Sequence, residues 1–313
     1  MITLSARALI TGAFTTLALS TPMGAASASP VDPPSPQTQK DLDQSMRGEA
    51  FANASYRLYA AQAERENLPS VARLFERTAD VELGEHFRES AELSGLVRSD
   101  AENLRAAEAG EIYEFRTMYP GFARDAKAGG DTRAAKRFSE IARDEGKHAR
   151  AFGAALRAVE SGAAESGGGA VPKPPEAEPE QVPQGPPEVR AQRTKTDLDK
   201  ALHGEALAYA KYHEFAEHAE NPAVGKLFRG AADVELHEHF AGEAKLAGLV
   251  GDTRANLTKA VAGERYESQT MYPTFAKRAE EAGDSKAAAR FSNDAEDEAG
   301  HARAFQQALD ELS

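Results

Sequence analysis

The chain has 313 residues, enough for two domains of ordinary size, and a formal net charge of −13 at pH 7. An acidic protein is repelled by nucleic acid and by anionic membranes, so neither is expected as a partner. The sequence contains no cysteine, which excludes disulfides, thiolate zinc sites, iron–sulfur clusters and cysteine nucleophiles within it. A redox role would therefore depend on Glu, His and Tyr side chains.

Residues 1–28 have the features of a secretory signal peptide. Arg7 precedes an apolar run over residues 8–19, and the small-residue motif Ala26–Ala28 follows. The run is too short and too rich in threonine to span a bilayer. We expect cleavage after Ala28, a secreted or otherwise extracytoplasmic protein, and no membrane insertion of the mature chain. Pro and Ser dominate residues 29–40, which predicts a disordered leader.

Helical periodicity begins near residue 41 and defines four helices in the first half of the chain. The first is predicted over residues 41–65, and the second begins at Pro69 and ends near Gly95. The third begins at the capping box Ser99–Glu102 and is predicted to be interrupted by Pro120, because proline removes a helical hydrogen bond. The fourth follows the break at residues 129–131 and continues to residue 160.

The second half of the chain repeats the first after a linker. Residues 161–196 are rich in Gly and Pro without apolar periodicity, which predicts a semi-extended spacer with no core of its own. Residues 197–313 then repeat residues 41–160, with Glu264 standing 153 positions after Glu111. Since no strand pattern is present, the sequence predicts an all-α protein of two tandem four-helix bundles, residues 41–160 and 197–313.

Acidic residues and histidines recur on the apolar faces of these helices. Three pairs in each copy have i, i+3 spacing, which directs both side chains toward one spot, and a Gly-Glu motif precedes each set. The pairs are Glu82/Glu85, Glu111/Glu114 and Glu145/His148, then Glu235/Glu238, Glu264/Glu267 and Glu298/His301, and the preceding carboxylates are Glu49 and Glu205.

Inward-facing carboxylates need positive partners. A single Glu in a Glu-rich helix is usually solvated or paired with Arg. Burying several unpaired carboxylates costs several kcal/mol each, against a total stability of about 5–15 kcal/mol. Divalent cations offset that cost, and an oxygen-rich set with one histidine favours iron or manganese, with zinc as a further option. The pattern predicts a dinuclear metal site in each copy.

The motifs resemble the di-iron domain of rubrerythrins. The most specific block is Ala-Gly-Glu-x2-Glu-x3-Met-Tyr-Pro at residues 109–120, repeated at residues 262–273. The block Phe-x3-Ala-x2-Glu-x2-His occupies residues 138–148 and recurs at residues 291–301. Together with the segments around Glu49 and Glu205, the resemblance covers about three quarters of the chain.

The resemblance implies a ferritin-like four-helix bundle in each half, each holding a di-iron centre. The implied ligands of the first half are Glu49, Glu82, Glu85, Glu111, Glu114, Glu145 and His148. Those of the second are Glu205, Glu235, Glu238, Glu264, Glu267, Glu298 and His301. Tyr56, Tyr119, Tyr212 and Tyr272 match the tyrosines that lie near the cluster in the family, where they would hydrogen-bond the ligand carboxylates.

The chain departs from the family pattern in two respects. Rubrerythrins usually carry a rubredoxin-like domain whose cysteines hold an electron-relay iron, so a chain without cysteine is expected to need an external electron donor. In addition, Glu85 and Glu238 stand where the family has histidine, and His86 and His239 follow one position later. We take Glu85 and Glu238 as ligands, and His86 and His239 as neighbours of the ligands or alternative ligands.

The resemblance implies reduction of hydrogen peroxide or O2 coupled to oxidation of Fe(II). The alternative is a protein without catalytic activity that captures or delivers Fe, Mn or Zn. The sequence leaves open whether the halves pair with each other within one chain or form a homodimer with a second chain.

Overall fold

The computed structural model describes residues 33–166 and 170–312, and their regular structure is helical throughout, as predicted. The first half contains α1 (Pro36–Arg65), α2 (Pro69–Val81), α3 (Arg88–Ser94), α4 (Asp100–Tyr113), α5 (Tyr119–Ala128) and α6 (Thr132–Glu160). The second contains α7 (Gln192–Glu217), α8 (Pro222–Val234), α9 (Ala241–Ala247), α10 (Thr253–Tyr266), α11 (Tyr272–Ala282) and α12 (Ser285–Glu311).

Short segments of other helix types complete the chain. The π-helical segments are η1 (Glu82–Phe87), η2 (Glu114–Met118), η4 (Glu235–Phe240) and η5 (Glu267–Met271), and η3 (Ala163–Ser166) is a 3-10 turn after α6. Each π-segment joins two α-helices into one continuous rod. Pro120 therefore does not interrupt the third helix as predicted, because the wider turn of η2 leads into α5, where Pro120 lies in the first turn and needs no partner for its nitrogen.

The N-terminal boundary differs from the sequence-based one. The predicted signal peptide, residues 1–28, lies outside the described residues. Of the predicted leader, residues 36–40 belong to α1, because Pro36 occupies the first turn and the Ser35 hydroxyl accepts a hydrogen bond from the Thr38 amide at 3.3 Å. No helix in the part of the chain that the structure describes combines the length and hydropathy needed to cross a membrane.

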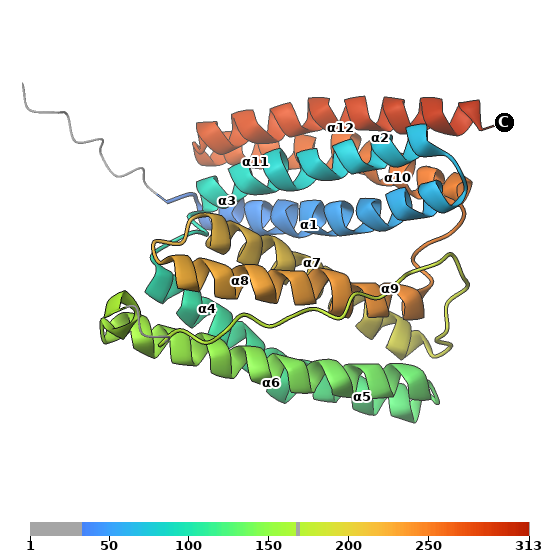
Figure 1. Cartoon of the computed structure of the whole chain (residues 1–313). Helices are drawn as coiled ribbons and strands as arrows, with labels where there is room; N and C mark the ends of the chain where they lie inside the picture. Colours follow the sequence, from blue (N-terminus) through green and yellow to red (C-terminus); the bar gives the residue numbers. More distant parts are fainter. Residues whose placement is uncertain (1–32, 167–169, 313) are drawn as a thin grey trace, which may run out of the picture. The chain divides into compact units, whose positions relative to one another are not determined.

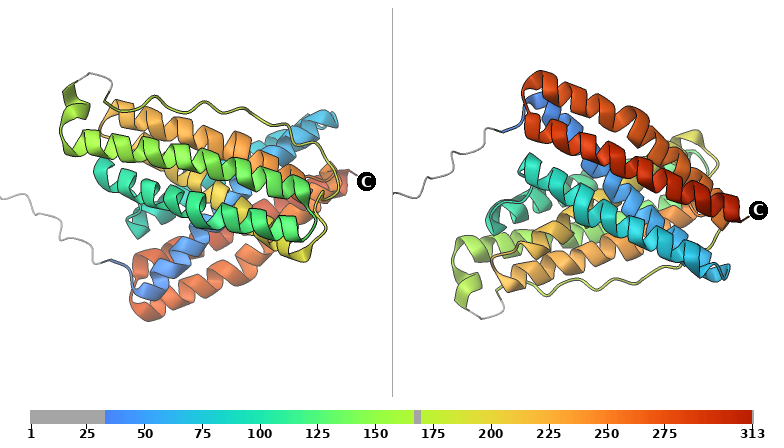
Figure 2. Two further views of the ribbon diagram at one scale, coloured as in Figure 1. Left: turned by 90° about the horizontal axis from the view of Figure 1, so that it is seen from below. Right: turned by 90° about the horizontal axis from the view of Figure 1, so that it is seen from above.

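Two four-helix bundles are present, as predicted, but each takes helices from both halves of the chain (Figures 1 and 2). Bundle 1 consists of α1, the rod α2–η1–α3, the rod α10–η5–α11, and α12. Bundle 2 consists of α7, the rod α8–η4–α9, the rod α4–η2–α5, and α6. The expectation that each half forms its own bundle is therefore corrected, and the described residues form one compact unit.

The length of one connection explains this exchange. A ferritin-like bundle needs one long crossover between its second and third helices. The rod from α4 to α5 is about 43 Å long at 1.5 Å per residue, whereas the connection 95–99 reaches at most about 18 Å. Because this connection cannot run back along its own bundle, it delivers α4 to the neighbouring bundle, and residues 248–252 do the same for α10.

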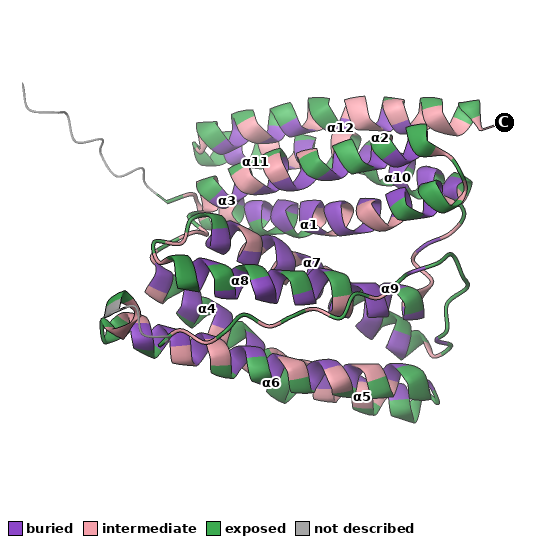
Figure 3. Ribbon diagram, viewed as in Figure 1, coloured by how far each residue is buried: buried purple, intermediate pink, exposed green. Residues whose placement is uncertain are grey.

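Helices α1 and α7 lie against each other where the bundles meet, and buried residues follow their length in Figure 3. Phe51 of α1 stacks on His203 of α7 with ring centroids 4.1 Å apart. Arg88 of α3 forms an ion pair at 3.0 Å with the buried carboxylate of Glu214 in α7. The largest apolar core cluster of the described chain also runs across this contact and includes residues of both bundles.

The linker is extended, but it is also packed against the protein. Residues 170–191 run along α8 and α9 in Figure 1. The amides of Glu180 and Glu188 donate to the carbonyls of His237 and Leu246, both at 2.9 Å, and Val182 is buried. The segment between α6 and α7 is thus held in place by hydrogen bonds, whereas the sequence predicted a semi-extended spacer.

Candidate metal centres

The first candidate centre lies inside bundle 1 and is built from both halves of the chain. Glu49 of α1 and Glu82 and His86 of η1 come from the first half. Glu264 of α10 and the pair Glu298 and His301 of α12 come from the second. Their ligand atoms form two overlapping groups, each gathered within 4.8 Å. With Glu267 at its edge, we call this set site 1: Glu49, Glu82, His86, Glu264, Glu267, Glu298 and His301.

The second candidate centre repeats this arrangement inside bundle 2. Glu205, Glu235 and His239 of the second half converge with Glu111, Glu145 and His148 of the first, again in two groups gathered within 4.8 Å. With Glu114 at its edge, we call this set site 2: Glu111, Glu114, Glu145, His148, Glu205, Glu235 and His239. The structure therefore divides each ligand set that the sequence placed in one half between two sites.

The π-segments decide which residue of the second helix faces the metals. Hydrogen bonding from residue i to i+5 widens the turn, so position i+4 returns to the face of position i while i+3 points away. His86 is accordingly buried beside Glu82, with His86 Nδ1 2.9 Å from Glu82 Oε2, whereas Glu85 is exposed. The structure thus reverses the sequence-based preference for Glu85.

The second half shows the same exchange at the equivalent positions. His239 Nδ1 lies 2.9 Å from Glu235 Oε2 and 3.0 Å from Glu145 Oε1. Glu238 lies at the rim, where its carboxylate accepts a hydrogen bond from the linker amide of Glu178 at 3.1 Å. His239, and not Glu238, belongs to the four-residue groups of site 2, while Glu238 forms a separate group with Asp144 and His239 at the rim.

Glu114 and Glu267 stand apart from the convergent groups. Both are only half-buried, and neither belongs to the groups gathered within 4.8 Å among the described residues. Glu267 nevertheless reaches α1, because its Oε1 lies 3.5 Å from where a Cβ on Gly48 would be. These two carboxylates border the sites, where burial and then repulsion from the ligand carboxylates raise the pKa of each.

Each of the four predicted tyrosines holds a ligand carboxylate from the other half of the chain. Tyr212 Oη donates to Glu111 Oε1 at 2.5 Å, and Tyr56 donates to Glu264. In the same way, Tyr119 donates to Glu205 and Tyr272 donates to Glu49. All four rings are buried. The placement fits the role that the family resemblance implied for them.

The carboxylates held by tyrosine keep a free oxygen. Glu49, Glu111, Glu205 and Glu264 each have one oxygen on a tyrosine and a buried Oε2 without a hydrogen-bond partner in the described chain. The carboxylates of Glu82 and Glu145 lie instead against histidine nitrogens, with His86 Nδ1 2.9 Å from Glu82 Oε2 and His239 Nδ1 3.0 Å from Glu145 Oε1. Buried polar atoms are normally satisfied, so this number of orphaned oxygens at two spots fits bound cations.

The electrostatics of the sites also demand positive charge. Burial, followed by repulsion from Glu298 and Glu267, raises the pKa of Glu49 well above its usual range. Burial opposes the charged form of His86, but the nearby carboxylates of Glu298 and Glu82 outweigh it and raise its pKa to about 12. Burial, Glu145 and Glu235 likewise raise the pKa of Glu111. The donor set of glutamates with histidine nitrogens fits a pair of iron or manganese ions at each site.

Each site contains a further buried carboxylate that the sequence analysis missed. In bundle 1 it is Asp294 of α12, which forms an ion pair with Arg290 and lies 4.0 Å from His86 Nε2. In bundle 2 the equivalent position is Ile141, and the carboxylate is Glu243 of α9, 3.2 Å from Tyr119 Oη. Glu243 is in turn equivalent to Ser90 of α3. The signal was a difference between the repeats, which a search for shared motifs passes over.

Comparisons with known proteins agree with this geometry. The family model described as Rubrerythrin matches residues 80–156 and 197–309. A rubrerythrin from Porphyromonas gingivalis is 37% identical over 139 residues, covering 40% of this chain and 69% of that protein. A rubrerythrin from Nitratidesulfovibrio vulgaris is 32% identical over 129 residues, covering 37% and 67%. The nigerythrin of that organism is 31% identical over 137 residues, covering 40% and 68%. No solved structure matches the chain at a significant level.

Proposed function

The chain belongs to the rubrerythrin family, and on this basis we propose that it is an exported di-iron oxidoreductase that reduces hydrogen peroxide with electrons from an external donor. The family relationship supports di-iron redox chemistry of the peroxidase type. The signal-like pattern of residues 1–28 supports export, and the absence of cysteine supports an external donor.

The observation that carries the proposal is the set of carboxylates with one oxygen held and one free. Site 1 and site 2 would each hold two irons, and iron bound there supplies electrons and Lewis acidity for cleavage of an O–O bond. The tyrosine hydroxyls fix Glu49, Glu111, Glu205 and Glu264 in orientation, so that their free oxygens converge with the histidine nitrogens. Burial of the ligands excludes bulk water from the reacting oxygen atoms.

The overall reaction converts one hydrogen peroxide, two protons and two electrons into two waters. The donor replaces the two electrons after each turnover. A buried carboxylate oxygen that is released from its hydrogen bond can take up a proton and pass it on, so the ligand glutamates are suitable proton carriers. O2 is the alternative oxidant at the same ligands.

Anaerobic loading tests this function. The mature protein is loaded with Fe(II), hydrogen peroxide is added with a reductant in excess, and peroxide consumption is measured per iron. We expect consumption well beyond the iron present. A matched variant with Glu82→Ala and Glu235→Ala, which removes one central carboxylate from each site, should consume little.

The same experiment separates catalysis from metal capture. If peroxide consumption stops when the bound iron has been oxidised once, although reductant remains, the protein binds metal without turnover. Failure to bind iron at all would overturn both functions.

A further inference from the structure

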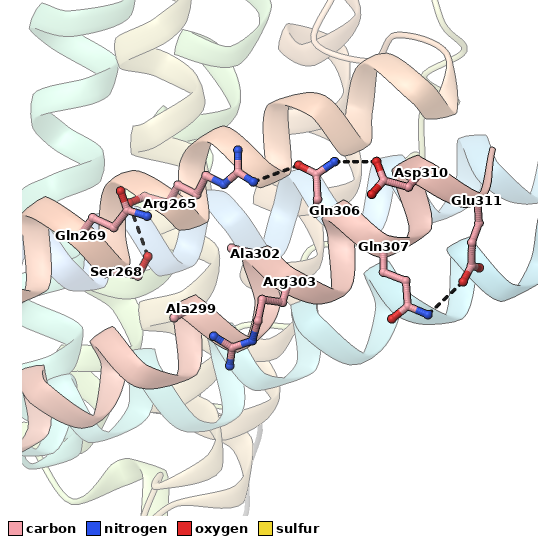
Figure 4. A pocket seen from close by; sticks show the side chains of 10 residues that line it. All are labelled: Arg265, Ser268, Gln269, Ala299, Ala302, Arg303, Gln306, Gln307, Asp310 and Glu311. Atoms are coloured by element: carbon pink, nitrogen blue, oxygen red, sulfur yellow. Dashed lines mark hydrogen bonds between the residues drawn. The ribbon is translucent and has the colours of Figure 1, made fainter. Parts of the chain in front are cut away.

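A groove of about 620 Å³ lies on the outer surface of bundle 1, and Figure 4 shows the side chains that line it. It runs between α12 and the rod formed by α10 and η5. Three of its lining residues follow site 1 ligands in sequence: Ser268 follows Glu267, Ala299 follows Glu298, and Ala302 follows His301. The helix turns that carry these ligands therefore form the floor of the groove.

Site 1 is more accessible than site 2 at the end that faces this groove. The His301 side chain is 18% exposed, whereas the equivalent His148 in site 2 is 5% exposed. The neighbouring ligands Glu298 and Glu145 are buried in both sites. The two sites therefore differ in the exposed fraction of one histidine, His301 or His148, and in the surface outside it.

A phenylalanine covers the equivalent surface of bundle 2. Phe115 stands at the position of Ser268, and its ring lies over Gly146, where an added Cβ would be 3.1 Å from a ring carbon. Gly146 is in turn equivalent to Ala299. Farther along, the carboxylate of Glu108 lies over Gly153. Gly146 thus leaves room for the Phe115 ring next to the site 2 ligand Glu145, whereas Ser268 and Ala299 leave the equivalent surface of site 1 open.

Two arginines line the open groove, and Arg303 is the one beside the helix turn that carries Glu298 and His301. Arg265 and Arg303 both line it, and Arg303 lies alongside Ala299 and Ala302 in Figure 4. Arg265 is positioned by a hydrogen bond from its Nη2 to Gln306 at 3.0 Å. The acidic residues of the groove, Asp310 and Glu311, lie toward its other end. On a protein with a net charge of −13, this local pair of guanidinium groups can attract small anions.

We propose that this groove is the entrance through which small anions reach site 1, that the external electron donor of the proposed function is a small anion that uses it, and that site 2 lacks this entrance. The inference rests on the proposed function only in the identity of the reductant. The two centres of one chain would then exchange small anions with the solution at different rates, quickly at site 1 and slowly at site 2.

Release of Fe(II) to a chelator tests the entrance without depending on peroxide turnover. The anaerobically loaded holoprotein is mixed with a sulfonated, anionic phenanthroline chelator, and the coloured complex is followed over time. We expect two phases of equal amplitude. The double substitution Ser268→Phe and Ala299→Gly should convert the fast phase into a slow one. The reverse pair, Phe115→Ser and Gly146→Ala, should convert the slow phase into a fast one.

A variant that changes only charge tests the entrance independently of the substitutions that cover or uncover the surface. Arg303→Gln should slow the fast phase roughly tenfold with the anionic chelator and leave release to neutral bipyridyl unchanged. Gln307→Ala, at the far end of the groove, is the matched control and should change neither rate. A single phase in the wild type, or equal effects of Arg303→Gln on both chelators, would overturn the proposal while leaving the proposed function intact. Failure to load iron would instead count against the proposed function.

Discussion

Four tyrosine hydroxyls determine how the ligand carboxylates are presented. Each fixes one oxygen of a buried glutamate, and the other oxygen remains free to bind a cation. A hydrogen bond to a charged group is worth more than one between neutral groups, and a buried carboxylate that loses its donor bears the full desolvation penalty. The tyrosines therefore contribute to both the stability of the bundles and the orientation of the ligands.

We expect Tyr119→Phe and Tyr272→Phe each to lower the free energy of unfolding by about 1.5–3 kcal/mol, because each removes the hydroxyl that holds Glu205 or Glu49. Urea denaturation of the metal-loaded protein measures the effect. Tyr59→Phe is the control, since Tyr59 is also buried, in a neighbouring core cluster, but makes no hydrogen bond to a ligand carboxylate in the described chain. Equal losses in all three variants would show that the hydrogen bond to a ligand carboxylate adds nothing beyond the general loss of a buried hydroxyl.

Asp294 and Glu243 provide the same charge from different helices. In bundle 1, Ser90 and Asp294 occupy positions that Glu243 and Ile141 occupy in bundle 2. Burial raises the pKa of Asp294 to about 6 against the opposing charges of His86 and Arg290. Burial likewise raises the pKa of Glu243 despite His239 and Arg137. The exchange keeps one carboxylate beside an arginine in each bundle.

A double-mutant cycle tests whether the two arrangements are interchangeable. Asp294→Ile should destabilise the protein by roughly 3 kcal/mol, because Arg290 loses its buried partner. Adding Ser90→Glu should restore a large part of that loss, with a coupling energy of about 1–3 kcal/mol by urea denaturation. Strictly additive effects of the two substitutions would contradict the structural equivalence.

The π-segments are the elements that assign ligand roles. All four begin at a predicted ligand: Glu82, Glu114, Glu235 and Glu267. In η1 and η4 the wider turn brings a histidine at i+4 to the ligand face and directs the glutamate at i+3 outward. Sequence spacing read with 3.6 residues per turn cannot detect this, since i+3 and i+4 both lie near the same face of an α-helix.

His86→Ala and Glu85→Ala therefore should have different effects, although the residues are adjacent. We expect His86→Ala to weaken metal binding at site 1 by roughly tenfold or more, because it removes a nitrogen from the convergent group. Glu85→Ala should leave the affinity unchanged, since its side chain is exposed. Metal titration of both variants makes the comparison, and a larger effect of Glu85→Ala would restore the sequence-based assignment.

In the whole molecule, the exchange of helices makes each metal centre depend on both halves of the chain. The short connections 95–99 and 248–252 pass the third and fourth helices of each half to the other bundle. The contacts between α1 and α7 then hold the bundles together, and the linker adds a hydrogen bond at 2.8 Å from Arg65 of α1 to the Val182 carbonyl. Each bundle needs helices from both halves, and the chain supplies both halves within one molecule.

Two pairs of substitutions distinguish this topology from one in which each half forms its own site. Glu82→Ala with Glu298→Ala removes two residues of site 1 and none of site 2. We expect this variant to keep about half of the wild-type iron. Glu82→Ala with Glu145→Ala damages one residue of each site, so both should be impaired. Iron analysis of the purified variants gives the answer, and the opposite ranking would show that the sites form within each half.

The sequence by itself determined the helical class, the internal repeat, the family and most residues that line the sites. These properties follow from local patterns: helical periodicity, capping signals, and glutamates and tyrosines at fixed spacing. Glu49, Glu82, Glu111 and Glu145 lie on apolar stripes, and burial of those stripes in any bundle brings the carboxylates inward. Such information is present in each helix before the helices assemble.

Only the tertiary structure decided which helices share a bundle, which residue of η1 and η4 faces the metals, and how the two sites differ. The repeat makes the alternative pairings nearly identical in local sequence, so the choice depends on how far residues 95–99 can reach. The choice between Glu85 and His86 depends on a hydrogen-bond register that packing imposes on the rod. Asp294, Glu243 and Phe115 acquire their roles from contacts with helices distant in sequence, and no local pattern encodes those contacts.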